Sequence, residues 1–306
     1  MNAKLIGTVG EDLTREEWLV LRKSGIGGSE APAICGAVNW ASPMSVYLDK
    51  LELTDKKEIN ESMEWGNRLE VPVTEKVEEV TGHEVVSRQM FCSHKDYPWM
   101  LATVDGVTEN DNGEQGLVEI KTTGSWRGKT WADDVPLHVF VQVEHDLAVT
   151  GLPWAIVGVL IGGQHFQLHT VKRDDEYIEQ LIALEKDFYT NHLEPQVPPA
   201  IDGSTSAEDM LKILFPADDG TEATRDEPEI IAAAKRYLEE AEECRIQEKE
   251  KRAAANKLKE MIGSSERVTI GGKYIATWKT VVRRSKNGKE TSFRKFEVKE
   301  ITDRDA

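Results

Sequence analysis

The sequence predicts an α/β protein with a mixed central sheet flanked by helices, followed by a C-terminal extension of a helix and β-hairpins. Two observations support this fold class. Amphipathic helical segments alternate with short strand-like segments over the first two thirds of the chain. After a Pro-, Gly- and Asp-rich stretch, a charge-rich helical segment precedes a basic segment with strand periodicity. The expected domains are residues 1–200 and 227–306, joined by a connecting segment, 201–226, that has room for a short helix.

The N-terminal segment is expected to form two helices separated by a glycine-rich turn. TREEWLVLRKS has a helical pattern, and Thr14 with Glu17 three residues later forms a capping-box signature. Residues 25–28 include three glycines and end this helix. Ser29 can then cap a second helix, which tolerates Pro32 in its first turn.

A long amphipathic helix and a run of strands follow. The helix is expected from Asn60 to Gly82, interrupted or tightened near Pro72. Two further segments, HVFVQVEHDLAVTG and DEYIEQLIALEKDFYTNHL, have helical patterns. Strands are expected in EVVSRQMF, WMLATVDGV and GLVEIKT, and a buried hairpin in WAIVGVLIGG with FQLHTVKR. Strands that pair among helices in this way favour a mixed sheet with helices on its faces.

The C-terminal third differs in composition. The stretches EPQVPPAIDGST and FPADDGTEATRDEP are typical of connecting segments, and the helical SAEDMLKIL lies between them. Residues 227–262 form a charge-rich helical segment without clean heptads, so we expect a packed helix or a bent helical hairpin rather than a long coiled coil. Residues 267–299 are expected to form β-hairpins with a tight turn at Asn287 and Gly288.

The composition excludes several classes of protein. With 306 residues and a net charge of −17, the chain is an acidic globular protein long enough to bury a core. It has no apolar run near the roughly 20 residues of a membrane span, and its start lacks a signal-peptide pattern. Cys35, Cys92 and Cys244 are dispersed, so neither a disulfide framework nor an iron–sulfur cluster is expected. These features fit a reducing, cytoplasmic setting.

The stretch VDGVTENDNGEQGLVEIKT contains the strongest chemical signal. Asp105 ends one strand, and the polar turn after it brings this side chain back beside Glu119. Glu119 and Lys121 are two residues apart, so on a strand both point to one face while Ile120 points into the core. Two such carboxylates suit Mg²⁺ or Mn²⁺, which retain waters and take further ligands from a phosphate. Lys121 would stand against an attacking water or the charge that develops on phosphorus.

Three further segments add side chains to this hypothesis, and each has a simpler alternative. Arg22, with Ser29 at a helix start, would form a phosphate site; alternatively it pairs with a nearby acid such as Glu17. Glu70 lies among apolar neighbours on a helix, where a carboxylate is costly unless it is paired or binds metal; the alternative is a solvated helix position. Gln142 lies on an otherwise apolar helix face, as part of the site or as a satisfied interior amide.

In their order along the chain, these motifs resemble those of the YqaJ-type phage recombination nucleases, relatives of lambda exonuclease in the PD-(D/E)xK superfamily. The resemblance runs from about Trp18 to His192. It covers W-x(3)-R-x(2)-GIGGSE, the WGNRLE helix, the VDG strand, EIK and the Q-x-E-H-x-L-A-V-T-G helix. Two positions depart from the family pattern: Val104 replaces the superfamily's proline, and Glu144 replaces the second glutamine of many relatives.

The resemblance implies a restriction-endonuclease-like core with a magnesium-dependent nuclease site. By position, it implies that Asp105 and Glu119 are metal ligands, often joined by the carbonyl of Ile120. Lys121 would position or activate the water. Glu70 would hold a second metal or its waters.

The resemblance also implies a substrate and partners. Arg22, with Ser29, would receive the terminal 5′-phosphate, and Gln142 would orient the site or the DNA backbone. The implied activity is 5′ to 3′ digestion of double-stranded DNA ends in a bacterial host cell, which leaves 3′ single strands for an annealing protein. Lambda-exonuclease relatives form rings of three, so a homotrimer is implied. The alternatives are an endonuclease of the same fold and a non-catalytic scaffold that binds DNA ends or a partner protein.

Aromatic, histidine and basic residues outside these motifs leave alternatives open. Trp126 and Trp131 would either contact DNA or pack against the protein. His138 and His145 are expected on the helix surface or behind the site rather than as metal ligands. Residues 267–299 hold ten Lys or Arg against two Glu, interleaved with aromatic residues. This pattern suits DNA backbone contact and base stacking, whereas packing on the 227–262 helix and docking of a partner protein are the alternatives.

Overall fold

The computed structural model describes residues 3–54, 60–132, 134–218, 220–284 and 290–301 of the 306-residue chain. The chain divides into two compact units, Met1–Asp219 and Gly220–Ala306. None of the helices in the described ranges combines the length and the apolar character that crossing a membrane requires.

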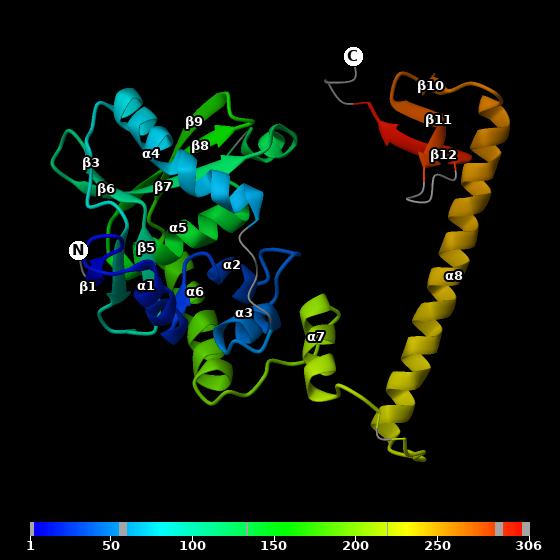
Figure 1. Ribbon diagram of the computed structural model, residues 1–306, viewed down its shortest axis with the longest axis horizontal. Helices are drawn as coiled ribbons and strands as arrows, with labels where there is room; N and C mark the ends of the chain where they lie inside the picture. The colour runs from blue at the N-terminus through cyan, green and yellow to red at the C-terminus, as the bar shows by residue number, and fades with distance from the viewer. Residues whose placement is uncertain (1–2, 55–59, 133, 219, 285–289, 302–306) are drawn as a thin grey trace. The chain divides into compact units, whose positions relative to one another are not determined.

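Two β-sheets form the centre of the first unit (Figure 1). One has the strand order β1-β4-β5-β2, and the other has the order β3-β6-β7-β8-β9. The pairs β2–β5 and β7–β8 are parallel and the other pairs are antiparallel, so both sheets are mixed. The strands are β1 (Ala3–Thr8), β2 (Ile26–Gly27), β3 (Val85–Val86), β4 (Met90–His94), β5 (Met100–Val104), β6 (Gly106–Glu109), β7 (Gln115–Thr123), β8 (Trp154–Ile161) and β9 (His165–Lys172).

Helices cover these sheets. The α-helices are α1 (Arg15–Leu21), α2 (Ala31–Ile34), α3 (Pro43–Lys50), α4 (Glu61–Thr81), α5 (Leu137–Thr150), α6 (Asp175–Phe188) and α7 (Thr205–Leu214). The shorter turns are the 3₁₀ helices η1 (Arg22–Ser24) and η2 (Ser125–Trp131) and the π-helical η3 (Tyr189–Leu193). α4 lies on one face of the five-stranded sheet, where Val77 shares a buried cluster with Val118 and Ile120. α5 lies on the other face, and its Leu147 is buried among residues of both sheets.

Several element boundaries form where the sequence pattern predicts them. Thr14 and Glu17 form the capping box that opens α1. Asn60 caps α4, and Gly82 ends it in the left-handed conformation, with φ 74°. The hairpin of β8 and β9 is antiparallel, and Gly151 ends α5. The mixed sheets flanked by helices therefore confirm the predicted fold class.

Two expectations for the first unit are wrong. α4 runs without a break through Pro72, because Pro72 and Arg68, whose carbonyl loses its donor, both lie on the exposed side of the helix. Ser29 does not cap the second helix: the turn continues through Glu30, which precedes α2, and no side chain caps this short helix. The Ser29 hydroxyl lies instead 3.4 Å from the guanidinium of Arg22.

The strand-like segment WMLATVDGV is divided between the two sheets at Asp105. β5 ends one residue before Asp105, in the four-stranded sheet, and β6 begins at Gly106, in the five-stranded sheet. A Cβ on Gly106 would lie 2.3 Å from Cγ1 of Val85, so a side chain here would force the two strands apart. EVVSRQMF is likewise divided, into β3 and β4, by Ser87 and Gln89 at positive φ.

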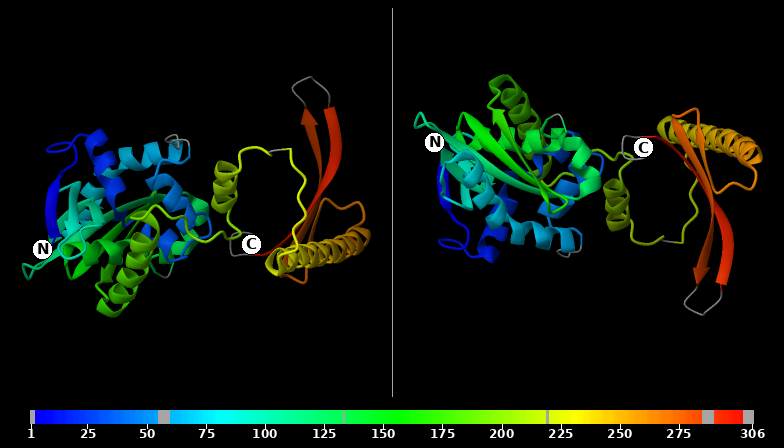
Figure 2. Two further views of the ribbon diagram at one scale, coloured as in Figure 1. Left: turned by 90° about the horizontal axis from the view of Figure 1, so that it is seen from below. Right: turned by 90° about the horizontal axis from the view of Figure 1, so that it is seen from above.

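The second unit consists of a long helix and a three-stranded antiparallel sheet. The helix α8 spans Pro228–Ile262, and the strands β10 (Arg267–Ile270), β11 (Tyr274–Arg284) and β12 (Glu290–Glu300) follow in that order across the sheet. Figures 1 and 2 show this sheet beside the C-terminal end of α8. The expected hairpin pairing is confirmed, while the turn expected at Asn287 and Gly288 lies outside the described residues.

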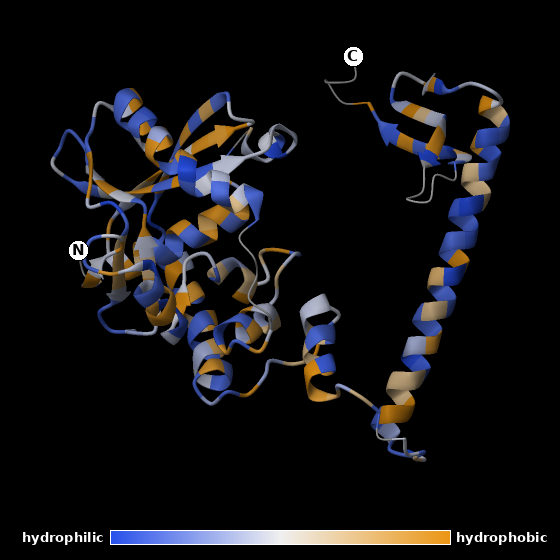
Figure 3. Cartoon of the chain, in the orientation of Figure 1, coloured by the Kyte–Doolittle hydropathy of each residue, from blue (hydrophilic) through white to orange (hydrophobic). Residues whose placement is uncertain are grey.

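Of the two forms expected for residues 227–262, the bent hairpin is wrong, and the described contacts place the packing near the C-terminal end of the helix. α8 is one continuous helix of 35 residues, and Ile262 is the buried residue among them. Figure 3 shows hydrophilic residues along most of its length. Ion pairs on one helix face, such as that between Arg245 and Glu242 (2.6 Å), stabilise an exposed helix of this kind in water.

Candidate functional site

The carboxylates and the lysine singled out in the sequence lie together where the two sheets meet. Glu119 and Lys121 point to one face of β7, with Lys121 Nζ 2.6 Å from Glu119 Oε1. Asp105 lies at the crossing from β5 to β6, and the backbone amide of Ile120 donates a hydrogen bond of 2.8 Å to its carboxylate. The hairpin of β6 and β7 therefore holds Asp105 beside the strand that carries Glu119.

Gln142 of α5 completes this cluster. Its amide nitrogen donates to Glu119 Oε1 at 2.8 Å, and its amide oxygen accepts from Lys121 Nζ at 2.9 Å. Each of the side chains of Glu119, Lys121 and Gln142 therefore contacts the other two, with a hydrogen-bond donor facing an acceptor in each contact. Gln142 fixes the orientation of both charged groups, and its own amide is satisfied by them.

Glu70 approaches the cluster from α4. The side-chain nitrogen of Gln89 donates to Glu70 Oε1 at 2.5 Å and lies 3.5 Å from Asp105 Oδ1. Glu70 is half-buried and hydrogen-bonded, as a carboxylate among apolar neighbours requires. No sequence pattern points to Gln89, because its position depends on a left-handed backbone, with φ 53°, between two divided strands.

The crowding of acids changes the ionisation of the cluster. Burial, and then the charges of Glu119 and Glu70, raise the pKa of Asp105 well above its usual range. Burial also raises the pKa of Glu70, with a smaller contribution from the charge of Glu119. Burial would lower the pKa of Lys121, but the charge of Glu119 and their hydrogen bond outweigh it, so the pKa is raised. Lys121 therefore keeps its proton, while the neighbouring carboxylates repel one another.

This donor set fits a hard divalent cation. Asp105 and Glu119 present carboxylate oxygens at one place, and a cation between them would relieve the repulsion that raises the pKa of Asp105. Within the described part of the chain, no three His, Cys, Asp or Glu side chains stand close enough to enclose a metal ion.

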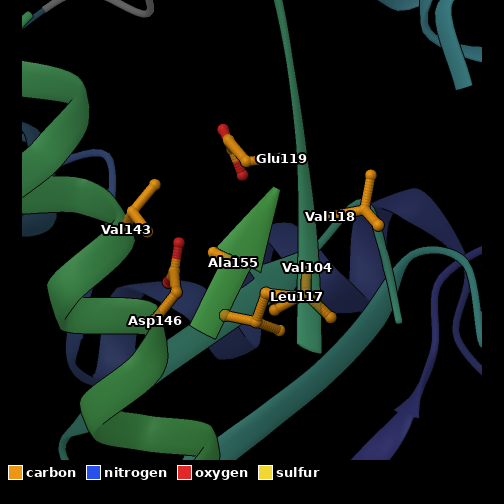
Figure 4. A pocket seen from close by; sticks show the side chains of 7 residues that line it. All are labelled: Val104, Leu117, Val118, Glu119, Val143, Asp146 and Ala155. Atoms are coloured by element: carbon orange, nitrogen blue, oxygen red, sulfur yellow. The ribbon is translucent and has the colours of Figure 1, made fainter. Parts of the chain in front are cut away.

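A buried acid, Asp146, lies one turn further along α5. It lines a small cavity with Glu119, and Figure 4 shows both carboxylates reaching toward this space. Burial raises the pKa of Asp146 to about 8, even though the charge of His145 opposes this shift. A Cβ on Gly28 would lie 2.5 Å from Asp146 Oδ1. The motif GIGGSE therefore needs glycine at this position, because its backbone passes against the helix that carries Gln142.

Arg22 and Ser29 form a second polar site at the glycine-rich turn. Arg22 Nη2 lies 3.4 Å from Ser29 Oγ and 3.0 Å from Glu30 Oε1. Lys50, to which no sequence pattern points, is 6% exposed and lies 2.7 Å from the other oxygen of Glu30. Glu17, the acid considered as an alternative partner for Arg22, is engaged in the α1 capping box. Two cations thus share one carboxylate, which leaves an excess of positive charge that favours an anion.

The histidines and tryptophans considered in the sequence differ in burial and surroundings. Burial, and then the charge of Lys121, lower the pKa of His138. His145 is fully buried, with Nδ1 2.8 Å from the carboxylate of Glu185, and His138 is half-buried. Trp131 is buried, whereas Trp126, on the segment after β7, is 77% exposed. Of these two tryptophans, Trp126 is therefore the one that a ligand can reach.

A family model for the YqaJ-like viral recombinase domain matches residues 17–153. This range contains the polar site at the glycine-rich turn and the carboxylate cluster. Over 313 residues, the chain is 32% identical to the uncharacterized protein YqaJ of Bacillus subtilis (strain 168). That match covers 95% of this chain and 96% of the relative.

Solved structures of an exonuclease are similar to this chain. LHK-Exo in complex with dAMP has a TM-score of 0.50 at 21% identity, covering 64% of this chain and 96% of that chain. A structure of the alkaline exonuclease LHK-Exo from Laribacter hongkongensis has a TM-score of 0.49 at 21% identity, covering 57% and 91%. The likeness to the dAMP complex shows a shared restriction-endonuclease-like fold. The family match and the 32% identity show that the chain belongs to the family of YqaJ-like viral recombinase domain proteins.

Proposed function

We propose that this protein is a metal-dependent deoxyribonuclease that digests double-stranded DNA from its ends. The observation that carries the proposal is the cluster of Asp105, Glu119 and Lys121, because carboxylates and an ammonium held at one place suit phosphodiester hydrolysis. The viral recombinase family, and the fold shared with LHK-Exo, favour a DNA exonuclease over other hydrolases.

The carboxylates would hold the metal. Asp105 and Glu119 would ligate Mg²⁺, or Mn²⁺, together with the carbonyl of Ile120, and Glu70 would hold a second ion or its waters. When bound, such an ion supplies Lewis acidity toward the phosphate and makes a water easier to deprotonate. The chain's own contribution is to fix the ligands: the Ile120 amide holds Asp105, and Gln89 holds Glu70.

Lys121 is proposed to orient the attacking water and to stabilise the charge that develops on phosphorus. Its ammonium has three N–H donors, of which Glu119 and Gln142 take two, at 2.6 and 2.9 Å. The third donor remains for a water or a phosphate oxygen. Because its raised pKa keeps the ammonium protonated, Lys121 would act as a hydrogen-bond donor and a positive charge rather than as a general base.

Arg22, with Ser29, is proposed to receive the terminal 5′-phosphate. The support for this role is the pairing of two cations, Arg22 and Lys50, with the single carboxylate of Glu30. A helix N-terminus contributes little here, because α2 is only four residues long and begins after Glu30. A phosphate seated beside Arg22 would define the 5′ end as the start of digestion.

The product and the assembly belong to the same proposal. Removal of nucleotides from 5′ ends leaves a 3′ single strand, which an annealing protein would bind in the cytoplasm of a bacterial host. A homotrimer around the duplex would explain how a chain with a net charge of −17 holds DNA, because only the charge that lines the channel then matters.

The proposal is tested with linear duplex DNA labelled at its 5′ or 3′ end, with and without a 5′-phosphate, beside a covalently closed circle. In Mg²⁺ we expect early release of the 5′ label from linear DNA only, and faster release when the 5′-phosphate is present. Lys121→Ala should reduce hydrolysis by about 10³-fold, since it removes the donor that meets the developing charge. Lys76→Ala, at an exposed ion pair on α4, is the matched control and should hydrolyse like the wild type.

Other outcomes distinguish the alternatives. Arg22→Ala should reduce the preference for a 5′-phosphate to about one, because the cation that contacts it is gone; an unchanged preference would remove Arg22 from the phosphate site. Cutting of the closed circle by the wild type would indicate an endonuclease of the same fold. Binding of DNA ends without hydrolysis in Mg²⁺ or Mn²⁺ would indicate a non-catalytic scaffold.

A further inference from the structure

The three-stranded sheet of the second unit carries much of its positive charge on one face. Side chains alternate between the two faces of a strand, so the cross-strand pair of Lys279 and Lys295 shares a face with Arg283 and Lys299. Arg267 of β10 joins this face, because it pairs with Thr277 of β11. We call these five cations and the side chains between them the basic face.

A groove runs along the basic face. Arg267, Lys279, Lys295 and Lys299 line it, together with Glu297 and with aliphatic and threonine side chains. Lys295 lies 3.7 Å from Glu297, and Lys279 lies 3.6 Å from Glu266. Ion pairs at such distances between exposed groups are weak, so they offer little resistance to a polyanion that competes for the cations.

The opposite face of the sheet is already used by the chain itself. Trp278 and Phe296 form a cross-strand pair there. The guanidinium of Arg294 lies 3.6 Å from the ring centroid of Trp278, and Lys259 of α8 lies 5.0 Å from that of Phe296. The packing of the aromatic face on the 227–262 helix, one of the alternatives considered in the sequence, is confirmed at the C-terminal end of α8. The basic face, by contrast, points away from these contacts.

We propose that the basic face binds the phosphate backbone of duplex DNA. The proposal rests on the proposed function, to which it adds a DNA contact in the second unit. Charge complementarity supports it: the chain has a net charge of −17, yet this face gathers five cations against Glu297. β11 and β12 have 11 residues each, so they are about 36 Å long, close to the length of about 34 Å of one turn of duplex.

The side chains of this face favour a duplex over a single strand. Proteins that bind single strands offer several aromatic rings on which successive bases stack. Of the two described aromatic residues of β12, Phe296 faces α8, and Phe293, 42% exposed, lies on the basic face with the guanidinium of Arg283 5.4 Å from its ring centroid. A face with five cations and one such ring suits contact with phosphates, which a duplex presents on two strands.

The test compares two full-length variants that each lose four positive charges. The basic-face variant carries Arg267→Thr, Lys279→Thr, Lys295→Thr and Lys299→Thr, and threonine is chosen because it retains strand propensity. The control variant carries Lys235→Gln, Arg236→Gln, Lys249→Gln and Lys251→Gln, all at exposed positions of α8. Binding is measured in EDTA to a 40-base-pair duplex closed by hairpins at both ends, so that neither hydrolysis nor free ends contribute.

We expect the basic-face variant to bind at least about tenfold more weakly than the control near 0.1 M salt. The slope of log affinity against log salt concentration should become shallower by about 3.6, since four phosphate contacts are lost. The double variant Lys279→Thr, Lys295→Thr should show about half of this change in slope. Its smaller perturbation keeps the test decisive if thermal melting shows the fourfold variant to be unfolded.

Three results would overturn the proposal. The first is equal affinity of the basic-face and control variants for the closed duplex. The second is a loss of binding confined to single strands. The third is competition by polyglutamate as strong as that by duplex DNA, which would indicate an acidic protein partner. A parallel Mg²⁺ reaction keeps the two proposals separate: hydrolysis with unaltered binding overturns the basic face alone, and lost binding without hydrolysis overturns the nuclease alone.

Discussion

The two units of this protein hold their charges in opposite ways. In the first unit, charged side chains at and behind the site are withdrawn from water: Glu119, Asp146 and Glu185 are 6%, 3% and 0% exposed. In the second unit, most of the described charges lie on the surface, paired along α8 or gathered on the basic face, while Arg294 is half-buried over Trp278. The position and ionisation of a buried charged group depend on a few hydrogen-bond and ion-pair partners. Substitution of one partner is therefore expected to have a large effect. Exposed charges act through their number, so single substitutions have small effects.

The largest effect is expected at Asp105. Asp105→Asn should reduce hydrolysis by about 10³-fold, because an amide is a poor metal ligand. In EDTA it should raise the melting temperature by about 2–4 °C, because it removes a charge that Glu119 and Glu70 repel and keeps an acceptor for the Ile120 amide. Asp111→Asn, at a position exposed in the β6–β7 turn, is the matched control and should change neither quantity. A lower melting temperature for Asp105→Asn would mean that the cluster is not strained by like charge.

A smaller effect is expected at the buried pair of His145 and Glu185. Burial would lower the pKa of His145, but Glu185 raises it to about 9, above the ordinary value of 6.5. The stability from this raised pKa is therefore present in full below pH 6.5 and is lost as the pH rises through 9. Glu185→Gln should cost about 3 kcal/mol at pH 6, and the cost should shrink by pH 9.

Denaturant unfolding at pH 6, 7.5 and 9 measures this dependence. Glu179→Gln, at an exposed position of the same helix, controls for the loss of a negative charge. A cost of Glu185→Gln that is the same at pH 6 and pH 9 would exclude ionisation of His145 as its source.

The smallest effect is expected on α8. Arg245→Gln removes a cation whose ion pair with Glu242 is 2.6 Å long but exposed, so the free energy of unfolding should change by less than about 0.5 kcal/mol. The same unfolding experiments measure it. A loss above about 1 kcal/mol would show that an individual ion pair on α8 contributes to stability as a buried pair of the first unit does. The difference proposed between the two units would then be wrong.

The sequence predicts the parts of the site that depend on neighbours in the chain. The two-residue spacing of Glu119 and Lys121 places them on one face of β7, and the short polar turn brings Asp105 back to that strand. Gln89 and Lys50 escape prediction, because each acquires its role from a segment far away in sequence. Gln89 reaches Glu70 on α4, and Lys50 reaches Glu30 before α2.

The fold shows the same division between local and distant effects. Periodicity and capping residues predict where helices form, as the α1 capping box shows, but not what a helix packs against. α8 is helical as predicted and largely exposed, and ion pairs spaced along its own surface contribute to its stability in water. The division of WMLATVDGV at Asp105 was equally out of reach, since which strand pairs with which depends on the assembled sheets.

Because the chain crosses from one sheet to the other at Asp105, the geometry of the site depends on how the two sheets are aligned. Asp105 is the one residue between β5 and β6, which belong to different sheets, whereas Glu119 is embedded in one of them. Any sliding of one sheet over the other would therefore alter the gap between these two carboxylates. The distance between the carboxylates of Asp105 and Glu119 therefore depends on how the two sheets are packed together. A core substitution such as Val85→Ile, at the residue facing Gly106, is therefore expected to slow hydrolysis although it changes none of the proposed metal ligands.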